Sequence, residues 1–222
     1  MLSAVHFRLF GQAATLAMHS VNSMVMLMSM MDEDLTRDPA IKTMVSLQAR
    51  YLTVWNIVFQ MSYFFLAFIC DFLTVTEKDN LLPKSIRKFR KNFFAIAVWP
   101  NTMLIFTVFW PVFIADRSLL FPAFIDKIFS FKSNLVIHFF IFPAAVWELV
   151  FTPRPVPKNH SQNLTYTSAV YLVYIIFVLI TYLQRGVWPY PILKILFGTI
   201  YFPLFLTAIY SALVMCYYSQ WK

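Results

Sequence analysis

The chain has 222 residues, of which 60% are hydrophobic and only 13% are charged, and its mean hydropathy is +0.66. A soluble core cannot bury so much apolar surface, so the composition excludes an ordinary globular protein and favours an integral membrane protein. The formal net charge of +8 fits membrane topology and contact with anionic lipids. Basic residues are not interleaved with aromatic residues as on a nucleic-acid-binding surface, so we expect membrane lipids as partners and no nucleic acid.

Apolar segments recur along the chain, each near the roughly 20 residues that cross the hydrocarbon core of a bilayer. They cover residues 4–30, 51–74, 93–115, 133–151, 167–184 and 192–218. The sequence therefore predicts an all-α, polytopic integral membrane protein with about six transmembrane helices and a single membrane domain over residues 1–222. The first segment is the weakest, because Arg8, His19 and Asn22 interrupt it, and a cleaved signal sequence is the alternative interpretation.

The orientation in the membrane is predicted from lysine and arginine. The connection at residues 76–92 is strongly basic, whereas residues 31–50 contain a cluster of acidic residues, so we place residues 76–92 and both termini in the cytoplasm. The glycosylation motifs at Asn159 and Asn163 then face the cytoplasm and should carry no glycan. The endoplasmic reticulum and the plasma membrane both remain open as locations, and the oligomeric state is left open.

Polar side chains gather on one face of the second predicted helix. At 100° per residue, Asn56 and Gln60 lie close to Thr53 on the helix surface, and Asp71 returns to the same face. Such groups would be unpaired in hydrocarbon, so this face must contact protein or trapped water. Hydrogen bonding between helices is the simpler interpretation of the pattern.

His138 lies within the apolar run 134–142, and an ionisable side chain at that depth is a functional-site hypothesis by default. The second and fourth predicted helices cross the membrane in the same direction, which brings Thr53 and His138 to the same leaflet. A neutral imidazole can take the proton of a threonine hydroxyl and so activate it as a nucleophile. Catalytic candidates are Thr53 and His138, with Asn134, Asn56 and Gln60 as residues that could orient the ring or donate to an oxyanion.

Several phrases, taken in order, resemble the androgen-induced protein family. They are Tyr51-Leu52-Thr53 with Asn56 and Gln60, Asp116-Arg117 with Phe121-Pro122, Asn134 with His138, Phe142-Pro143 with Glu148, and Gly186-Val187-Trp188-Pro189-Tyr190-Pro191. The similarity extends from about residue 50 to residue 218 and leaves the N-terminal fifth poorly covered.

The resemblance implies a multi-pass membrane hydrolase that cleaves fatty acid esters of hydroxy fatty acids with a threonine nucleophile and a histidine. Thr53 and His138 occupy those motif positions. Family members commonly carry Asn-His-x-x-His where this chain has Leu135 after Asn134, so the earlier histidine is replaced. The implied substrate is a lipid ester that enters the site from the bilayer, and no cofactor is implied.

Two other classes of function are compatible with the sequence. A non-enzymatic membrane regulator or scaffold would use the polar face only to pack helices, and a haem-binding membrane protein would use His19 and His138 as axial ligands. No cluster of metal ligands is present, and Cys70 and Cys216 predict neither a disulfide framework nor a zinc site. The remaining acids are expected to be structural and to pair with Arg117 or other interfacial bases; they are Asp71, Asp116 and Glu148.

Overall fold

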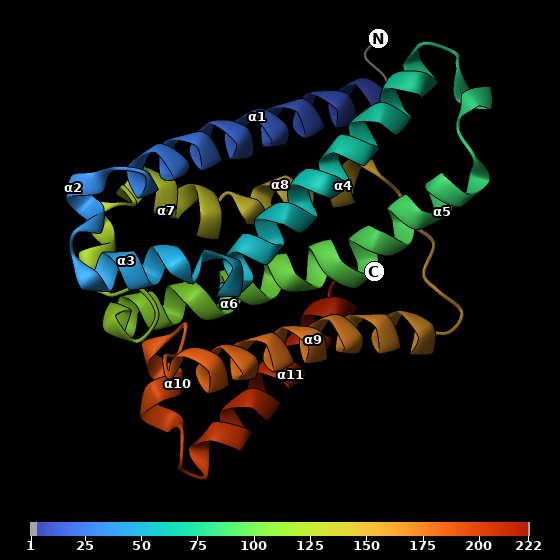
Figure 1. Ribbon diagram of the computed structural model, residues 1–222. Helices are drawn as coiled ribbons and strands as arrows, with labels where there is room; N and C mark the ends of the chain where they lie inside the picture. The colour runs from blue at the N-terminus through green and yellow to red at the C-terminus, as the bar shows by residue number, and fades with distance from the viewer. Residues whose placement is uncertain (1–3, 222) are drawn as a thin grey trace.

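The computed structural model describes residues 4–221, and all regular structure in that range is helical (Figure 1). The long helices are α1 (Ala4–Met30), α4 (Leu52–Val75), α6 (Trp99–Asp116), α9 (Ser161–Arg185) and α11 (Tyr201–Tyr218). Shorter α-helices are α2 (Glu33–Thr36), α3 (Pro39–Ser46), α5 (Lys84–Phe93), α7 (Phe131–His138), α8 (Ile141–Phe151) and α10 (Pro191–Leu196). Single turns occur at η1 (Gln48–Arg50), η2 (Asp79–Leu81), η4 (Arg117–Leu119) and η5 (Ala123–Lys127), with a π-helical turn η3 (Phe94–Val98) between α5 and α6.

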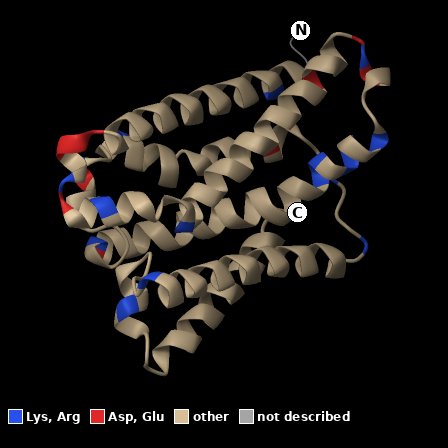
Figure 2. Ribbon diagram, in the orientation of Figure 1, with Lys and Arg blue, Asp and Glu red and all other residues tan. Residues whose placement is uncertain are grey.

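The chain runs back and forth between two ends of an elongated bundle (Figure 1). Both described termini lie at the same end, which fits an even number of crossings. Near the N-terminus, Arg8 pairs with Asp71 at the end of α4, and near the C-terminus the side-chain amide of Gln220 donates to the carbonyl oxygen of Ala95. Charged residues gather at the two ends of the bundle, while the middle of the helices is almost free of them (Figure 2).

The all-α membrane fold is confirmed. Five helical stretches in the part of the chain that the structure describes are long and apolar enough to cross a membrane: Leu52–Val75, Lys84–Leu119, Phe131–Phe151, Ser161–Arg185 and Tyr201–Tyr218. Helix α1 matches the first predicted segment but is not among these five. Its buried face is polar, with side chains spaced three or four residues apart that turn toward α4 and α8, namely Gln12, Thr15, His19 and Asn22.

Three predicted segments differ from the observed helices. The third begins at Lys84, because the basic residues that we assigned to a connection form the amphipathic first turns of a continuous helix. The fourth is broken between α7 and α8, since Pro143 lacks an N–H and its ring would clash with the carbonyl of Phe139 in a continuous helix. The last is broken between α10 and α11, where Gly198 adopts a positive φ of 83°.

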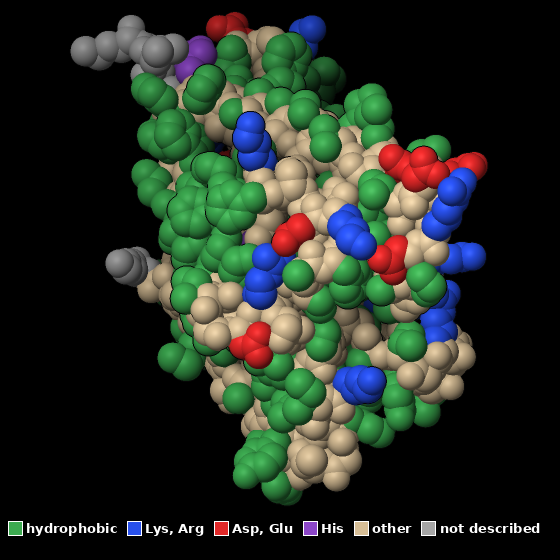
Figure 3. Space-filling view, turned by 90° about the vertical axis from the view of Figure 1, so that its left-hand side faces the viewer, with side chains coloured by type: hydrophobic (Ala, Val, Ile, Leu, Met, Phe, Trp, Pro, Cys, Tyr) green, Lys and Arg blue, Asp and Glu red, His purple; other side chains and the backbone are tan. Residues whose placement is uncertain are grey.

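The end of the bundle that carries the connections from α1 to α4 and from α9 to α11 is shown in Figure 3. Acidic and basic side chains are interspersed there among hydrophobic ones. Away from the ends, large apolar side chains are exposed along the helices, as a lipid-facing surface requires. Examples are Phe65, Phe72, Leu172, Ile176, Leu183, Leu204 and Met215.

Candidate functional site

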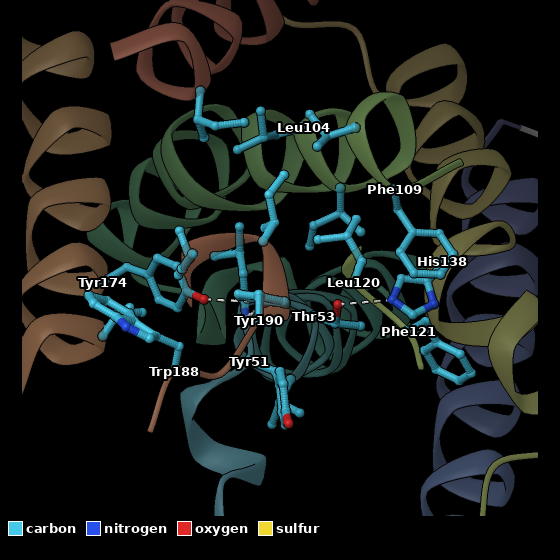
Figure 4. A pocket seen from close by; sticks show the side chains of 18 of the residues that line it. Tyr51, Thr53, Leu104, Phe109, Leu120, Phe121, His138, Tyr174, Trp188 and Tyr190 are labelled. Carbon is cyan, nitrogen blue, oxygen red and sulfur yellow. Dashed lines mark hydrogen bonds between the residues drawn. The ribbon is translucent and has the colours of Figure 1, made fainter. Parts of the chain in front are cut away.

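An apolar cavity of about 170 Å³ lies beside the first turns of α4. Its wall comes from several helices that are distant in sequence, and Thr53 and His138 lie on one side of it (Figure 4). Tyr174 and Trp188 lie on the side opposite His138, and Tyr190 lies between them and Thr53. Most of the remaining wall is aliphatic or aromatic, so the cavity suits an apolar ligand with a reactive group near Thr53.

The hydroxyl of Thr53 and the imidazole of His138 are in direct contact. The distance from Thr53 Oγ1 to His138 Nε2 is 3.1 Å, which is within hydrogen-bonding range. Thr53 is half-buried at the cavity wall, whereas only 5% of His138 is exposed. The structure thus brings together the two residues that sequence analysis paired by depth.

Asn134 determines which nitrogen of the His138 ring carries the proton. Its side-chain oxygen lies 2.6 Å from His138 Nδ1, and a carbonyl oxygen can only accept a hydrogen bond. Nδ1 must therefore be the protonated nitrogen, which leaves Nε2 as the acceptor for the Thr53 hydroxyl. The order Asn134, His138, Thr53 is that of an orienting group, a base and a nucleophile.

Aromatic residues hold the imidazole plane. The ring of Phe109 on α6 stacks on His138 with a centroid distance of 3.5 Å and an interplanar angle of 2°, and Phe121 packs edge-on. The helix break after His138 also contributes, because the His138 carbonyl accepts a hydrogen bond from Trp110 Nε1 at 3.1 Å. Ring and backbone are therefore both fixed, which limits the movement of Nε2 away from Thr53.

Asn56 and Gln60 face the interior, as expected, but their hydrogen bonds run to other partners. Both are fully buried and neither lines the cavity. The hydroxyl of Thr102 donates to Asn56 Oδ1 at 3.0 Å, and Gln60 Nε2 donates to that hydroxyl at 2.8 Å. Gln60 Oε1 lies 2.8 Å from His19 Nε2. These residues join α1, α4 and α6 beneath the Thr53–His138 pair.

The two histidines considered for haem do not form a shared site. Both ring nitrogens of His138 are hydrogen-bonded, to Thr53 and Asn134, while His19 bonds to Gln60. The described residues 4–221 contain no group of three or more His, Cys, Asp or Glu side chains arranged for a metal ion.

Asp71 and Glu148 pair with basic residues, as expected, but their partners are arginines other than Arg117. Arg117 instead pairs with Asp126 at 2.7 Å, and Asp116 caps the turn at Ser118. Asp71 and Glu148 lie at the other end of α4 from Thr53, in a buried cluster that is shared with several cations. Arg90 contacts both acids at 2.9 Å, and Arg8 contacts Asp71 at 3.0 Å.

Gln12, which was not among the predicted site residues, donates to both acids of this cluster at 2.8 and 3.1 Å. The three- and four-residue spacing of polar residues in α1 was the available signal. Phe109 was also missed, since nothing in its own segment distinguishes it from other core phenylalanines. Leu135, which replaces a family histidine, does not line the cavity.

The model of the FAR-17a/AIG1-like protein family matches residues 12–220. The chain belongs to this family. Among relatives, the androgen-dependent TFPI-regulating protein of Mus musculus is 33% identical over 147 residues, which is 65% of this chain and 62% of the relative. The human protein of the same name is 29% identical over 143 residues, 64% of this chain and 61% of the relative.

A second FAR-17a/AIG1-like protein, the human androgen-induced gene 1 protein, is 24% identical over 152 residues, 65% of this chain and 63% of the relative. The matched regions thus cover less than two thirds of the relatives' own lengths. No solved structure matches the chain.

Proposed function

We propose that this FAR-17a/AIG1-like protein is an intramembrane hydrolase that cleaves fatty acid esters of hydroxy fatty acids, with Thr53 as nucleophile and His138 as base. The single observation that carries the proposal is the 3.1 Å contact between Thr53 Oγ1 and His138 Nε2 at the wall of an apolar cavity. A threonine hydroxyl is a weak nucleophile unless an adjacent base removes its proton, and the short distance to His138 Nε2 supports that role for the imidazole.

The reaction has two steps. Thr53 Oγ1 attacks the ester carbonyl while His138 Nε2 takes its proton, and the proton then passes to the leaving alkoxide as the ester C–O bond breaks. The first product is a hydroxy fatty acid, and the acyl group stays on Thr53. Water, deprotonated by His138, then attacks the acyl-threonine ester. His138 returns the proton to Thr53 Oγ1 as the bond between that oxygen and the acyl carbon breaks, and the fatty acid is released. Asn134 holds the ring in the tautomer that both steps need.

The surroundings of the pair support the proposed substrate class, which the family resemblance implies. An ester that joins two long acyl chains partitions into the bilayer, so it can enter the cavity laterally without first being extracted into water. The aliphatic and aromatic wall suits acyl chains, and the reacting polar groups are confined to one side. The membrane of residence is proposed to be the endoplasmic reticulum or the plasma membrane, with both termini in the cytoplasm.

The proposal is tested by hydroxy fatty acid release from such an ester by membranes that express the chain at matched levels. We expect Thr53→Ala and His138→Ala to lose turnover by at least about a hundredfold, and Thr53→Ser to retain much of it, because a hydroxyl remains beside the base. Thr107→Ala is the matched control, since the Thr107 hydroxyl bonds back to the carbonyls of Met103 and Leu104, at 2.7 and 3.3 Å, and Thr107 does not line the cavity.

An inactive wild type, or full activity in Thr53→Ala, would contradict the proposal. The result would then favour a non-enzymatic membrane regulator, in which the same polar residues only pack helices. The relatives in Mus musculus and in humans are named as TFPI-regulating proteins.

A further inference from the structure

The connection between α9 and α10 contains Gly186-Val187-Trp188-Pro189-Tyr190-Pro191, a phrase that the proposed reaction does not use. We propose that Tyr190 is a positioning residue that holds the first turn of α4 and thereby sets the place of the Thr53 hydroxyl relative to His138. This inference rests on the proposed function, because it gives Tyr190 a part in the same reaction.

Helix α4 begins without a cap of its own. The residue at its N-cap position is Tyr51, whose side chain makes no capping hydrogen bond, whereas Ser, Thr, Asp and Asn are the usual residues there. The first N–H groups of a helix have no partner within it. The Tyr190 hydroxyl fills this role for Leu52, whose N–H donates to it at 2.9 Å. The cap of α4 is thus supplied from a connection far away in sequence.

A second tyrosine completes the attachment. The Tyr174 hydroxyl on α9 lies 3.2 Å from the Tyr190 hydroxyl and 3.1 Å from the carbonyl oxygen of Arg50 (Figure 4). The Tyr51 ring packs edge-on against Tyr190 with a centroid distance of 5.5 Å. The backbone on both sides of Tyr51 is therefore held, the carbonyl before it by Tyr174 and the N–H after it by Tyr190.

The backbone around Tyr190 is itself restricted. Prolines on either side fix φ at Pro189 and Pro191, and Pro191 opens α10 at a position where proline is favoured. At the start of the phrase, Gly186 ends α9 with a φ of 68°, which lets the chain turn back sharply. Because this backbone has little conformational freedom, the Tyr190 hydroxyl can hold the start of another helix in one position.

Thr53 directly follows Leu52, whose N–H is bonded to Tyr190. A shift of this turn therefore changes the position of the Thr53 hydroxyl relative to His138. Misplacement of a reacting group by about 1 Å can cost about a hundredfold in rate. Tyr190 lines the cavity with its ring, which phenylalanine would keep, whereas its hydroxyl is bonded to the Leu52 N–H and to Tyr174. The contribution of the hydroxyl is therefore to the geometry of the chemical step. Its loss should lower kcat and leave KM almost unchanged.

The test compares Tyr190→Phe with Tyr210→Phe in the full-length protein, assayed with the same ester. Tyr210→Phe is the matched control, because the Tyr210 hydroxyl joins α11 to α9 through Ser168 at 2.8 Å and touches neither α4 nor the cavity. We expect Tyr190→Phe to lower kcat about tenfold or more with KM within about twofold, and Tyr210→Phe to match the wild type.

Hydrogen exchange of the peptide covering residues 50–54 gives a second readout that is independent of activity. Exchange should be faster in Tyr190→Phe and unchanged in Tyr210→Phe. Unchanged exchange in Tyr190→Phe, or faster exchange with a wild-type kcat, would overturn the inference. If the wild type fails to hydrolyse the ester, the proposed function fails, and the exchange rates alone show whether Tyr190 holds α4.

Discussion

The side-chain oxygen of Asn134 and Nδ1 of His138 are 2.6 Å apart, one helical turn from each other on α7. This contact lies inside a single short helix, so it does not depend on how the other helices pack. It fixes the ring tautomer locally, and the meeting with Thr53 then needs only the correct approach of α4.

Replacement of Asn134 by leucine, which is similar in size but has no acceptor, should lower turnover by at least about tenfold, because Nδ1 and Nε2 could then exchange the proton. Ser133→Ala is the control, since Ser133 is a buried neighbour on α7 that contacts Ser130 and not the ring. Hydrolysis by purified protein is the measurement, with expression and melting temperature compared in parallel. Equal turnover in both variants would remove Asn134 from the reaction.

The buried ion cluster should control stability. Arg90→Met removes the one arginine that contacts both Asp71 and Glu148 among the described residues, and the loss of one side of a buried ion pair costs about 3–5 kcal/mol. Arg87→Met is the matched control, because its ion pair with Asp79 is exposed and should contribute less than about 1 kcal/mol. Thermal unfolding in detergent would test this, and equal melting temperatures would contradict the expectation.

The contact between α1 and α8 depends on the absence of a side chain at Gly11. A Cβ atom there would meet the indole of Trp147, whose Nε1 is held by the carbonyl oxygen of Phe7 at 2.9 Å. Gly11→Leu should therefore destabilise the protein, although leucine is the better helix former by roughly 0.5–1 kcal/mol. Ala13→Leu, at an exposed site on α1, should be neutral. A higher melting temperature for Gly11→Leu would show that the two helices are not packed closely there.

The topology is tested by glycosylation. Asn159 and Asn163 lie at the end of the bundle that also holds both described termini, so a cytoplasmic location leaves both unmodified. Treatment with a glycosidase should not change the mobility of the wild type. Asp34→Asn creates an acceptor motif at the opposite end and should produce a glycosylated form. A mobility shift of the wild type on glycosidase treatment that is lost in Asn163→Gln would show that the orientation is the opposite of the predicted one.

The placement of Thr53 beside His138 followed from local information, because helix direction and depth can be counted along the sequence. Helix boundaries were harder. Pro143 was visible and proline disrupts the turn before it, yet the apolar run at residues 133–151 was interpreted as one continuous helix. Likewise, apolar residues at helical spacing within the basic segment, Ile86, Phe89 and Phe93, were the signal that this helix begins at Lys84.

Other contacts between distant segments could not be predicted from the chain. The hydrogen bond between Leu52 and Tyr190 depends on how α9 and α10 are placed against α4. Nothing in the sequence around a leucine or a tyrosine indicates that the two residues will pair. The same holds for Arg8 and Gln12, which reach Asp71 only because the polar face of α1 lies along α4. Periodicity identified the faces of the helices, but the rotation and register between helices come from packing of the whole bundle.

The break between α7 and α8 gives the site an electrical asymmetry. Because α7 ends at His138, its C-terminal carbonyl groups place partial negative charge near the imidazole, while Thr53 lies in the first turn of α4, where partial positive charge accumulates. In the proposed reaction a cation forms at His138 and an anion forms next to Thr53, and each meets the helix end of opposite sign. In an unbroken helix His138 would lie far from any terminus, so the backbone interruption lets two peptide dipoles favour charge separation inside a membrane.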